Sequence, residues 1–137
     1  MKRKIMFELS ETQKQLQSTA REFAKKEIAP RAAEVDRTEQ YPWENVELLT
    51  KQGFMGMTIP EEYGGSGLSL RAAAVILEEI HHSGGNGAAC HAQMYIMGTL
   101  LRHGSDEQKK RYLPGIADGS LRLQAFGVTE PSSGSDT

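Results

Sequence analysis

The stretch AACHAQMYIMGTLLRH, residues 88–103, is apolar on nearly every side when it is wound as an α-helix. A helix without a polar face belongs inside a protein, because no side of it favours contact with water. We therefore expect this helix at the centre of the fold. Its apolar residues are Ala92, Met94, Tyr95, Ile96, Met97, Leu100 and Leu101.

The segments on both sides of this stretch predict amphipathic helices with recognisable starts. Ser-x-x-Gln capping boxes stand at Ser10 and Ser105, where serine and glutamine side chains satisfy free N–H groups of the first turn. Pro42 suits the first turn of another helix, and Ser69 opens one more. Pro30 should kink or end the first helix, because it lacks an N–H and clashes with the preceding turn. The sequence thus predicts an all-α fold, a bundle of about five helices around the central apolar helix.

One segment near the C-terminus has a different period. Residues 121–126, LRLQAF, alternate apolar and polar side chains, which is the pattern of a half-buried β-strand. Because everything upstream looks helical, this strand has no partner within the chain. We expect Leu121, Leu123 and Ala125 to lie on a strand without sheet neighbours, leaving an exposed edge.

Composition excludes several classes of function and of site. The chain has 137 residues with 16 basic and 18 acidic side chains, a net charge of −2, which gives no field for nucleic acid or an anionic membrane. Cys90 is the single cysteine, so we expect no disulfide, a reducing compartment and a buried, inert thiol. The N-terminus has no apolar run that suits a signal peptide or a membrane span.

Two further patterns also favour structural readings. The four histidines form no i, i+4 pair on a helix and have no cysteine cluster beside them, so we expect no metal site. The loop 64–67, GGSG, lacks the preceding strand and the Lys-Ser/Thr pair of a phosphate loop. It is expected to be a structural turn into the next helix.

The final loop has the residue types of a ligand site. Thr129 offers a hydroxyl at the end of the predicted strand, Pro131 reverses the chain, and Gly134 and Ser135 add permissive backbone and a second hydroxyl. Backbone and hydroxyl donors in such a turn suit an anionic, planar ligand. On composition alone, a plain surface turn is the favoured interpretation.

Three motifs together resemble the acyl-CoA dehydrogenase family. They are PEEYGGSGL at 60–68, GSDEQKKRYLPGIADG at 104–119 and FGVTEPSSGSD at 126–136, in the family's order and spacing. Ser133 stands where the family has a small residue, often alanine. The resemblance implies that residues 1–120 form the family's N-terminal helical domain. Residues 121–137 would begin a middle β-domain that is truncated here.

The resemblance also implies an FAD site, which family members hold between subunits and domains. Thr129 would hydrogen-bond the flavin ring near N5 or O4, while the backbone of Val128 and the side chain of Phe126 would lie beside that ring. Gly134 and Ser135 would approach the pyrophosphate, with Ser135 also near the CoA ester.

A substrate cavity is implied for the central helix. By resemblance, its residues Cys90, His91, Gln93, Met94 and Met97 would line or flank the cavity for the acyl chain. The helical core explains the same residues without a ligand, so both interpretations stay open at this point.

The implied activity is that of an oxidoreductase of fatty-acid β-oxidation. The family removes the α-proton of an acyl-CoA thioester and passes the β-hydrogen as hydride to FAD, giving a trans-2-enoyl-CoA. Its carboxylate base comes from a C-terminal region absent here, and Glu130 matches a structural position instead. We therefore assign no catalytic residue and expect these 137 residues alone to be inactive, with weak or no FAD binding.

Partners and location follow from the same resemblance. The full-length protein would act on an acyl-CoA substrate, pass electrons to electron-transfer flavoprotein and assemble as a homo-tetramer or homo-dimer. It would lie in a bacterial cytoplasm or a mitochondrial matrix. Alternatives remain: a short non-catalytic helical module that binds acyl-CoA or a protein partner, or a related acyl-CoA oxidase or flavin monooxygenase.

Overall fold

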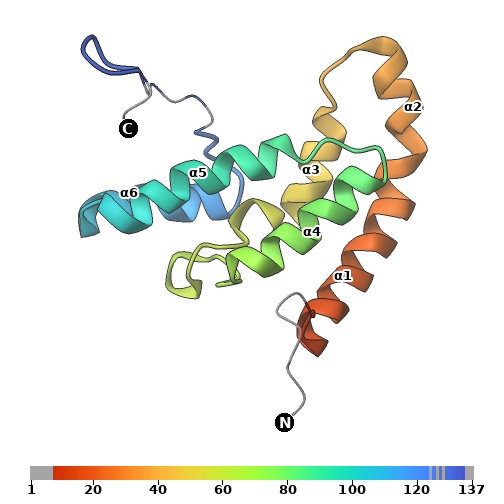
Figure 1. Ribbon diagram of the computed structural model, residues 1–137, viewed down its shortest axis with the longest axis horizontal. Coiled ribbons are helices and arrows are strands. Elements are labelled where there is room, and N and C mark those ends of the chain that lie inside the picture. Colours follow the sequence, from red (N-terminus) through yellow and green to blue (C-terminus); the bar gives the residue numbers. More distant parts are fainter. Residues whose placement is uncertain (1–7, 124, 126, 128, 135–137) are drawn as a thin grey trace.

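A computed structural model describes residues 8–123, 125, 127 and 129–134 of the chain. The described part is helical, and the predicted bundle is confirmed (Figure 1). No helix in this part has the length and apolar run needed to cross a membrane. The helices are α1 (Glu11–Phe23), α2 (Ala29–Thr38), α3 (Trp43–Lys51), α4 (Leu70–His82), α5 (Ala88–His103) and α6 (Asp106–Ala117), with a π-helical turn (Ala24–Ile28) joining α1 to α2.

The helix starts lie where local side-chain chemistry places them. Before α1, the Gln13 N–H donates to Ser10 Oγ at 3.2 Å, and the Ser10 N–H donates to Gln13 Oε1 at 3.0 Å. The same reciprocal pair joins Ser105 and Gln108 before α6. Both capping boxes are therefore confirmed, and each satisfies two N–H groups that a helix leaves free at its start.

Pro30 bends the first helix without ending it. The Ala29 N–H bonds to the Ala24 carbonyl, five residues back instead of four. This wider turn accommodates a residue that has no N–H and whose ring crowds the preceding carbonyls. Helices α1 and α2 therefore run on as one bent helix (Figure 1), which makes five helical segments in the described chain.

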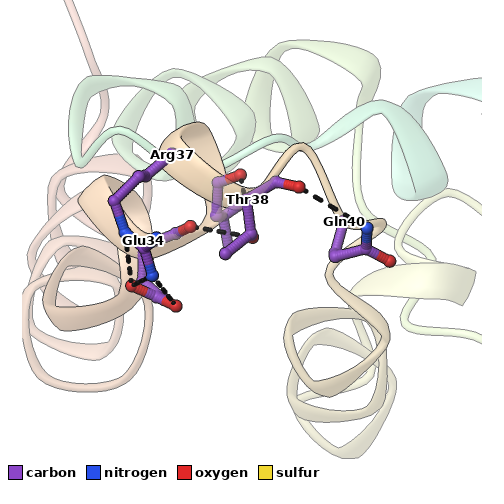
Figure 2. A network of polar contacts seen from close by, with 5 residues as sticks. Glu34, Arg37, Thr38 and Gln40 are labelled. Carbon is purple, nitrogen blue, oxygen red and sulfur yellow. Dashed lines mark hydrogen bonds and ion pairs between the residues drawn. The ribbon is translucent and has the colours of Figure 1, made fainter.

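Side-chain contacts hold the end of α2, where the chain reverses (Figure 2). Arg37 forms a forked ion pair with Glu34, with an Nη2–Oε1 distance of 2.6 Å, and the Thr38 hydroxyl donates to the Glu34 carbonyl at 2.9 Å. The next residue, Glu39, has the left-handed backbone (φ 55°) that stops a helix. Gln40 then reaches back to the Thr38 carbonyl at 3.5 Å.

The core has two clusters, and α5 contributes to both. The first cluster joins α1, α3, α4 and the start of α5, and it includes Leu49, Ile76 and Cys90. The second joins the middle of α5 to α6 and includes Met97 and Leu113. This central role of α5 confirms its prediction, although one of its faces is open to solvent.

The stretch between α3 and α4 is irregular, with two short 3₁₀ turns at Phe54–Gly56 and Glu61–Tyr63. Backbone hydrogen bonds hold it in one shape: the Gly67 N–H donates to the Ile59 carbonyl, and the Leu68 N–H to the Met57 carbonyl, both at 2.8 Å. The turn at 64–67 folds back on Ile59, whose side chain is fully buried.

The C-terminal segment differs from its prediction. Its described residues form no strand, because no neighbouring strand in the described chain offers a ladder of backbone groups, and only an isolated bridge joins Glu130 to Ser133. Leu121 and Leu123 have no sheet neighbours among the described residues, but the expected exposed edge is corrected, since both side chains pack partly buried against the second cluster.

A half-buried ion pair joins α1 to α4 and predicts a pH dependence. Glu79 is buried, while Arg21 is exposed. Arg21 donates to both carboxylate oxygens of Glu79, at 2.9 and 2.7 Å. These hydrogen bonds hold the pKa of Glu79 below its ordinary value, against an opposing effect of burial.

The pair is therefore expected to stabilise the fold above the unfolded carboxyl's pKa and to lose that effect as pH falls through the lower folded pKa. Urea unfolding of the wild type and Glu79→Gln should show a wild-type advantage near pH 7 that shrinks below about pH 4. An advantage that stays constant from pH 7 to pH 3 would contradict this.

Candidate functional site

A groove of about 650 Å³ runs along the outer face of α5. His91, Tyr95 and Thr99 follow one another at four-residue steps, so they share this face. The rings of His91 and Tyr95 lie 4.6 Å apart between centroids, and the Tyr95 hydroxyl is 3.4 Å from His91 Nδ1. Other lining residues are Thr58, Leu70, Met94, Leu101 and Arg102.

The groove combines apolar and polar walls. Leu70, at the start of α4, is 69% exposed and Tyr95 is 52% exposed, although both are large apolar or aromatic residues. Arg102 and His103 lie at its far end, in the last turn of α5. A surface of this kind suits a ligand with an apolar part and a polar end.

The structure divides the five predicted substrate residues into two groups. His91 and Met94 line the groove, whereas Cys90, Gln93 and Met97 are fully buried behind it. Burial raises the pKa of the Cys90 thiol to about 12. Met97 contacts the groove indirectly, because the Thr58 hydroxyl donates to its sulfur at 2.9 Å.

Gln93 binds the segment that follows α6. Its Nε2 donates to the Leu121 carbonyl at 2.8 Å, and the Leu123 N–H donates to its Oε1 at 2.9 Å. The side-chain amide thus offers one donor and one acceptor to alternate backbone groups, which is what a neighbouring strand would offer.

The residue between these two bonds contacts the opposite side. The Arg122 guanidinium lies 5.1 Å from the centroid of the Trp43 ring, within the range of a cation–π contact. Trp43, at the start of α3, is 59% exposed and packs edge-on against Tyr41 with centroids 4.7 Å apart. The segment 121–123 is therefore held on both sides.

The predicted flavin residues lie at and beyond this segment. Thr129 and Gly134 are exposed in a turn closed by hydrogen bonds between the backbones of Glu130 and Ser133, at 2.9 and 3.2 Å. Figure 1 shows this turn standing away from the bundle. Phe126, Val128 and Ser135 lie outside the described residues.

The chemistry of this turn fits part of a flavin site. Thr129 presents a hydroxyl to solvent, and a Cβ built at Gly134 would meet nothing within 4 Å, so a ligand has room to approach the backbone. Among the described residues, no three His, Cys, Asp or Glu side chains gather to hold a metal ion.

Comparison with known proteins gives this architecture a family. The family model of the acyl-CoA dehydrogenase N-terminal domain matches residues 10–120. The chain belongs to this family. The matched residues include helices α1 to α6 and the residues that line the groove along α5.

The curated relatives include enzymes of different activity. The chain is 41% identical over 132 residues to the 3-sulfinopropanoyl-CoA desulfinase of Paraburkholderia xenovorans. This match covers 95% of this chain and 34% of that protein. It is 37% identical over 133 residues to the short-chain-specific acyl-CoA dehydrogenase of Clostridium acetobutylicum, covering 96% and 35%. The chain thus spans about a third of the length of these relatives.

A solved structure gives the same fold. The glutaryl-coenzyme A dehydrogenase in complex with glutaryl-CoA matches with a TM-score of 0.76 and 36% identity, over 96% of this chain and 34% of that one. The acyl-CoA dehydrogenase fold of the N-terminal domain is therefore supported by both sequence and structure.

Sequence reasoning missed the contacts that Gln93 and Arg122 make. The missed signal is a glutamine at the centre of an otherwise apolar helix, because a buried amide needs partners that the helix backbone does not supply. The contact of Arg122 with Trp43 could not be predicted from the local sequence, because the two residues are 79 positions apart.

Proposed function

We propose that this chain forms the helical wall of the acyl-CoA site in an FAD-dependent acyl-CoA dehydrogenase. The protein would oxidise an acyl-CoA thioester to the trans-2-enoyl-CoA by α-proton abstraction and hydride transfer. The observation that carries the proposal is the groove of about 650 Å³ along α5, in a chain whose residues 10–120 match the family. FAD, when bound, would accept the hydride.

Each part of the groove has a proposed role. Met94, Leu70 and Leu101 offer apolar surface to the acyl chain, and His91 with Tyr95 forms an aromatic wall beside them. Cys90 and Met97 shape this wall from behind by filling the core. Apolar walls exclude water, which strengthens the electrostatic interactions on which such a reaction depends.

The flavin contacts belong to the turn at 129–134. Thr129 would donate its hydroxyl to the flavin ring, and Gly134 would let the backbone approach the pyrophosphate. The exposure of Thr129 and the open space at Gly134 support this assignment, and Phe126, Val128 and Ser135 complete it as expectations. Electron-transfer flavoprotein as acceptor, assembly as a homo-tetramer or homo-dimer, and a cytoplasmic or mitochondrial location belong to the same proposal.

The isolated chain is expected to be inactive. Glu130 lies exposed on the turn rather than in the groove. We therefore propose that the catalytic base comes from the region of the longer relatives that this chain does not span. Titration of the 137-residue chain with FAD, followed by flavin fluorescence, should show no stoichiometric binding. Tight one-to-one binding would contradict this part of the proposal.

A second candidate reaction is hydrolytic cleavage of the carbon–sulfur bond of a 3-sulfinoacyl-CoA, in which water supplies a hydrogen to the carbon and an oxygen to the sulfur, so that sulfite leaves. The identity to a 3-sulfinopropanoyl-CoA desulfinase favours it, and a groove with an apolar wall and a cationic end would serve either substrate. The two candidates differ in the fate of the flavin electrons, because only the dehydrogenase reaction reduces FAD.

A chimera tests the proposal. Residues 10–137 would replace the matching region of the clostridial short-chain dehydrogenase, which then supplies its own base and remaining domains. We expect bound FAD that is bleached anaerobically by at least one of a series of acyl-CoAs, with the unaltered host as control. Release of sulfite from 3-sulfinopropanoyl-CoA would favour the second candidate. A folded, FAD-loaded chimera that is reduced by no acyl-CoA would contradict the dehydrogenase proposal.

A further inference from the structure

We infer that Gln93 is a positioning residue, whose buried amide sets the register of residues 121–123 and thereby places the turn at 129–134. The inference rests on the proposed function, because it assigns that turn to the flavin. It adds a role for Gln93 other than lining the acyl cavity.

The first argument is the burial of the amide. The Gln93 side chain is fully buried, and its oxygen and nitrogen bond to the backbone of Leu123 and Leu121. A buried amide that loses its partners bears the full penalty of desolvation. No buried side-chain nitrogen or oxygen in the described chain lacks a partner, so this pairing is the arrangement that the core enforces.

The second argument is the alternation of the segment. Leu121 and Leu123 pack against the second core cluster, while Arg122 points to the Trp43 ring. A slip of one residue would exchange the two faces. It would drive the Arg122 charge toward Met97 and Leu113 and expose two leucines, so both sides of the segment oppose a slip.

The third argument is the length of the connection. Leu123 and Thr129 are six residues apart, and six extended residues reach at most about 21 Å. Fixing Leu123 against α5 therefore limits where Thr129 can stand relative to the groove, whose residues His91 and Met94 lie on the same helix. A single side chain thus couples the substrate wall to the flavin turn.

Hydrogen exchange of the 137-residue chain tests the register. Gln93→Met keeps the length of the side chain and removes both bonds, so the protection factor of the Leu123 amide should fall about tenfold or more. Ile116→Val is a matched control in the same cluster. It should change the protection factor of the Leu123 amide only as much as it changes the protection factors of the α6 amides. Unchanged protection at Leu123 in Gln93→Met would overturn the inference.

Gln93→Glu should make the protection factor of the Leu123 amide depend on pH, an effect that is not expected if Gln93 only fills space in the core. A neutral carboxyl has one donor and one acceptor, like the amide, whereas a carboxylate has no donor for the Leu121 carbonyl. The carboxylate still accepts the Leu123 N–H, but its buried charge beside the Leu121 carbonyl oxygen should detach the whole segment. Protection at Leu123 should therefore increase as pH falls and the carboxyl gains its proton. A pH-independent protection factor would count against the inference, and this variant also serves if Gln93→Met does not fold.

The same variants in the chimera test the link to flavin. Gln93→Met should weaken FAD binding about tenfold and alter the flavin absorbance bands, while Ile116→Val leaves both unchanged. Faster hydrogen exchange of the Leu123 amide in Gln93→Met, together with an unaltered FAD affinity, would overturn the positioning role. A chimera that binds no FAD with Gln93 intact would contradict the proposed function instead, and the exchange data would still decide the register.

Discussion

Gly65→Ala is expected to destabilise the protein by about 3 kcal/mol, the largest effect we expect of any single added methyl group. A Cβ at this position would lie 2.1 Å from the Ile59 carbonyl oxygen and 2.5 Å from the Ile59 Cβ. Neither neighbour is free to move, because Ile59 is fully buried and its carbonyl accepts the Gly67 N–H. Urea unfolding followed by circular dichroism measures the change.

Two other glycines supply matched controls. Gly64 has a left-handed backbone (φ +83°) but open space around it, so Gly64→Ala should destabilise by only about 1 kcal/mol. Gly98 lies within α5 and has nothing within 4 Å, so Gly98→Ala should stabilise the helix by up to about 1 kcal/mol. The prediction fails if Gly65→Ala unfolds at the same urea concentration as Gly64→Ala.

Cys90 is expected to react with thiol reagents about 1,000-fold more slowly in the folded protein than in urea. Burial raises the pKa of its thiol from 9.0 to about 12, and three pKa units lower the reactive thiolate fraction about 1,000-fold near neutral pH. Its side chain is also fully buried. The rate of colour release from a disulfide reagent at pH 8, with and without urea, measures the difference.

Cys90→Ala is the blank for this experiment, since the chain has no other cysteine. A native protein that reacts within a few-fold of the unfolded rate would show that the start of α5 opens readily. That result would also remove Cys90 from the core cluster that it shares with Ile76 and Leu49.

The helical architecture was predictable because its signals are local. The capping boxes at Ser10 and Ser105 depend on residues three positions apart, and both form as the sequence indicates. The effect of Pro30 was predicted only in part. The π-helical turn that absorbs it depends on how Ala24 and Ile28 pack in the core, which the local pattern does not express.

The groove and the C-terminal segment were harder to predict, for a nonlocal reason. Residue types mark Tyr95 and Leu70 as core, yet the described chain does not cover them. The alternation at 121–123 predicted which side chains face inward, but a glutamine from α5 takes the place of the neighbouring strand. The alternation of apolar and polar residues shows which side chains face inward, but it does not identify the group with which the backbone pairs.

The two faces of α5 separate what must be kept from what is free to vary in evolution. Cys90, Gln93 and Met97 hold the fold together, while Tyr95 and Thr99, on the opposite side, are exposed and belong to neither buried cluster. Substitutions on the outer face therefore alter the groove at little cost to folding. Proteins that carry this helix can therefore acquire new ligands through substitutions on its outer face while they keep the fold, as in relatives of different activity that share one architecture.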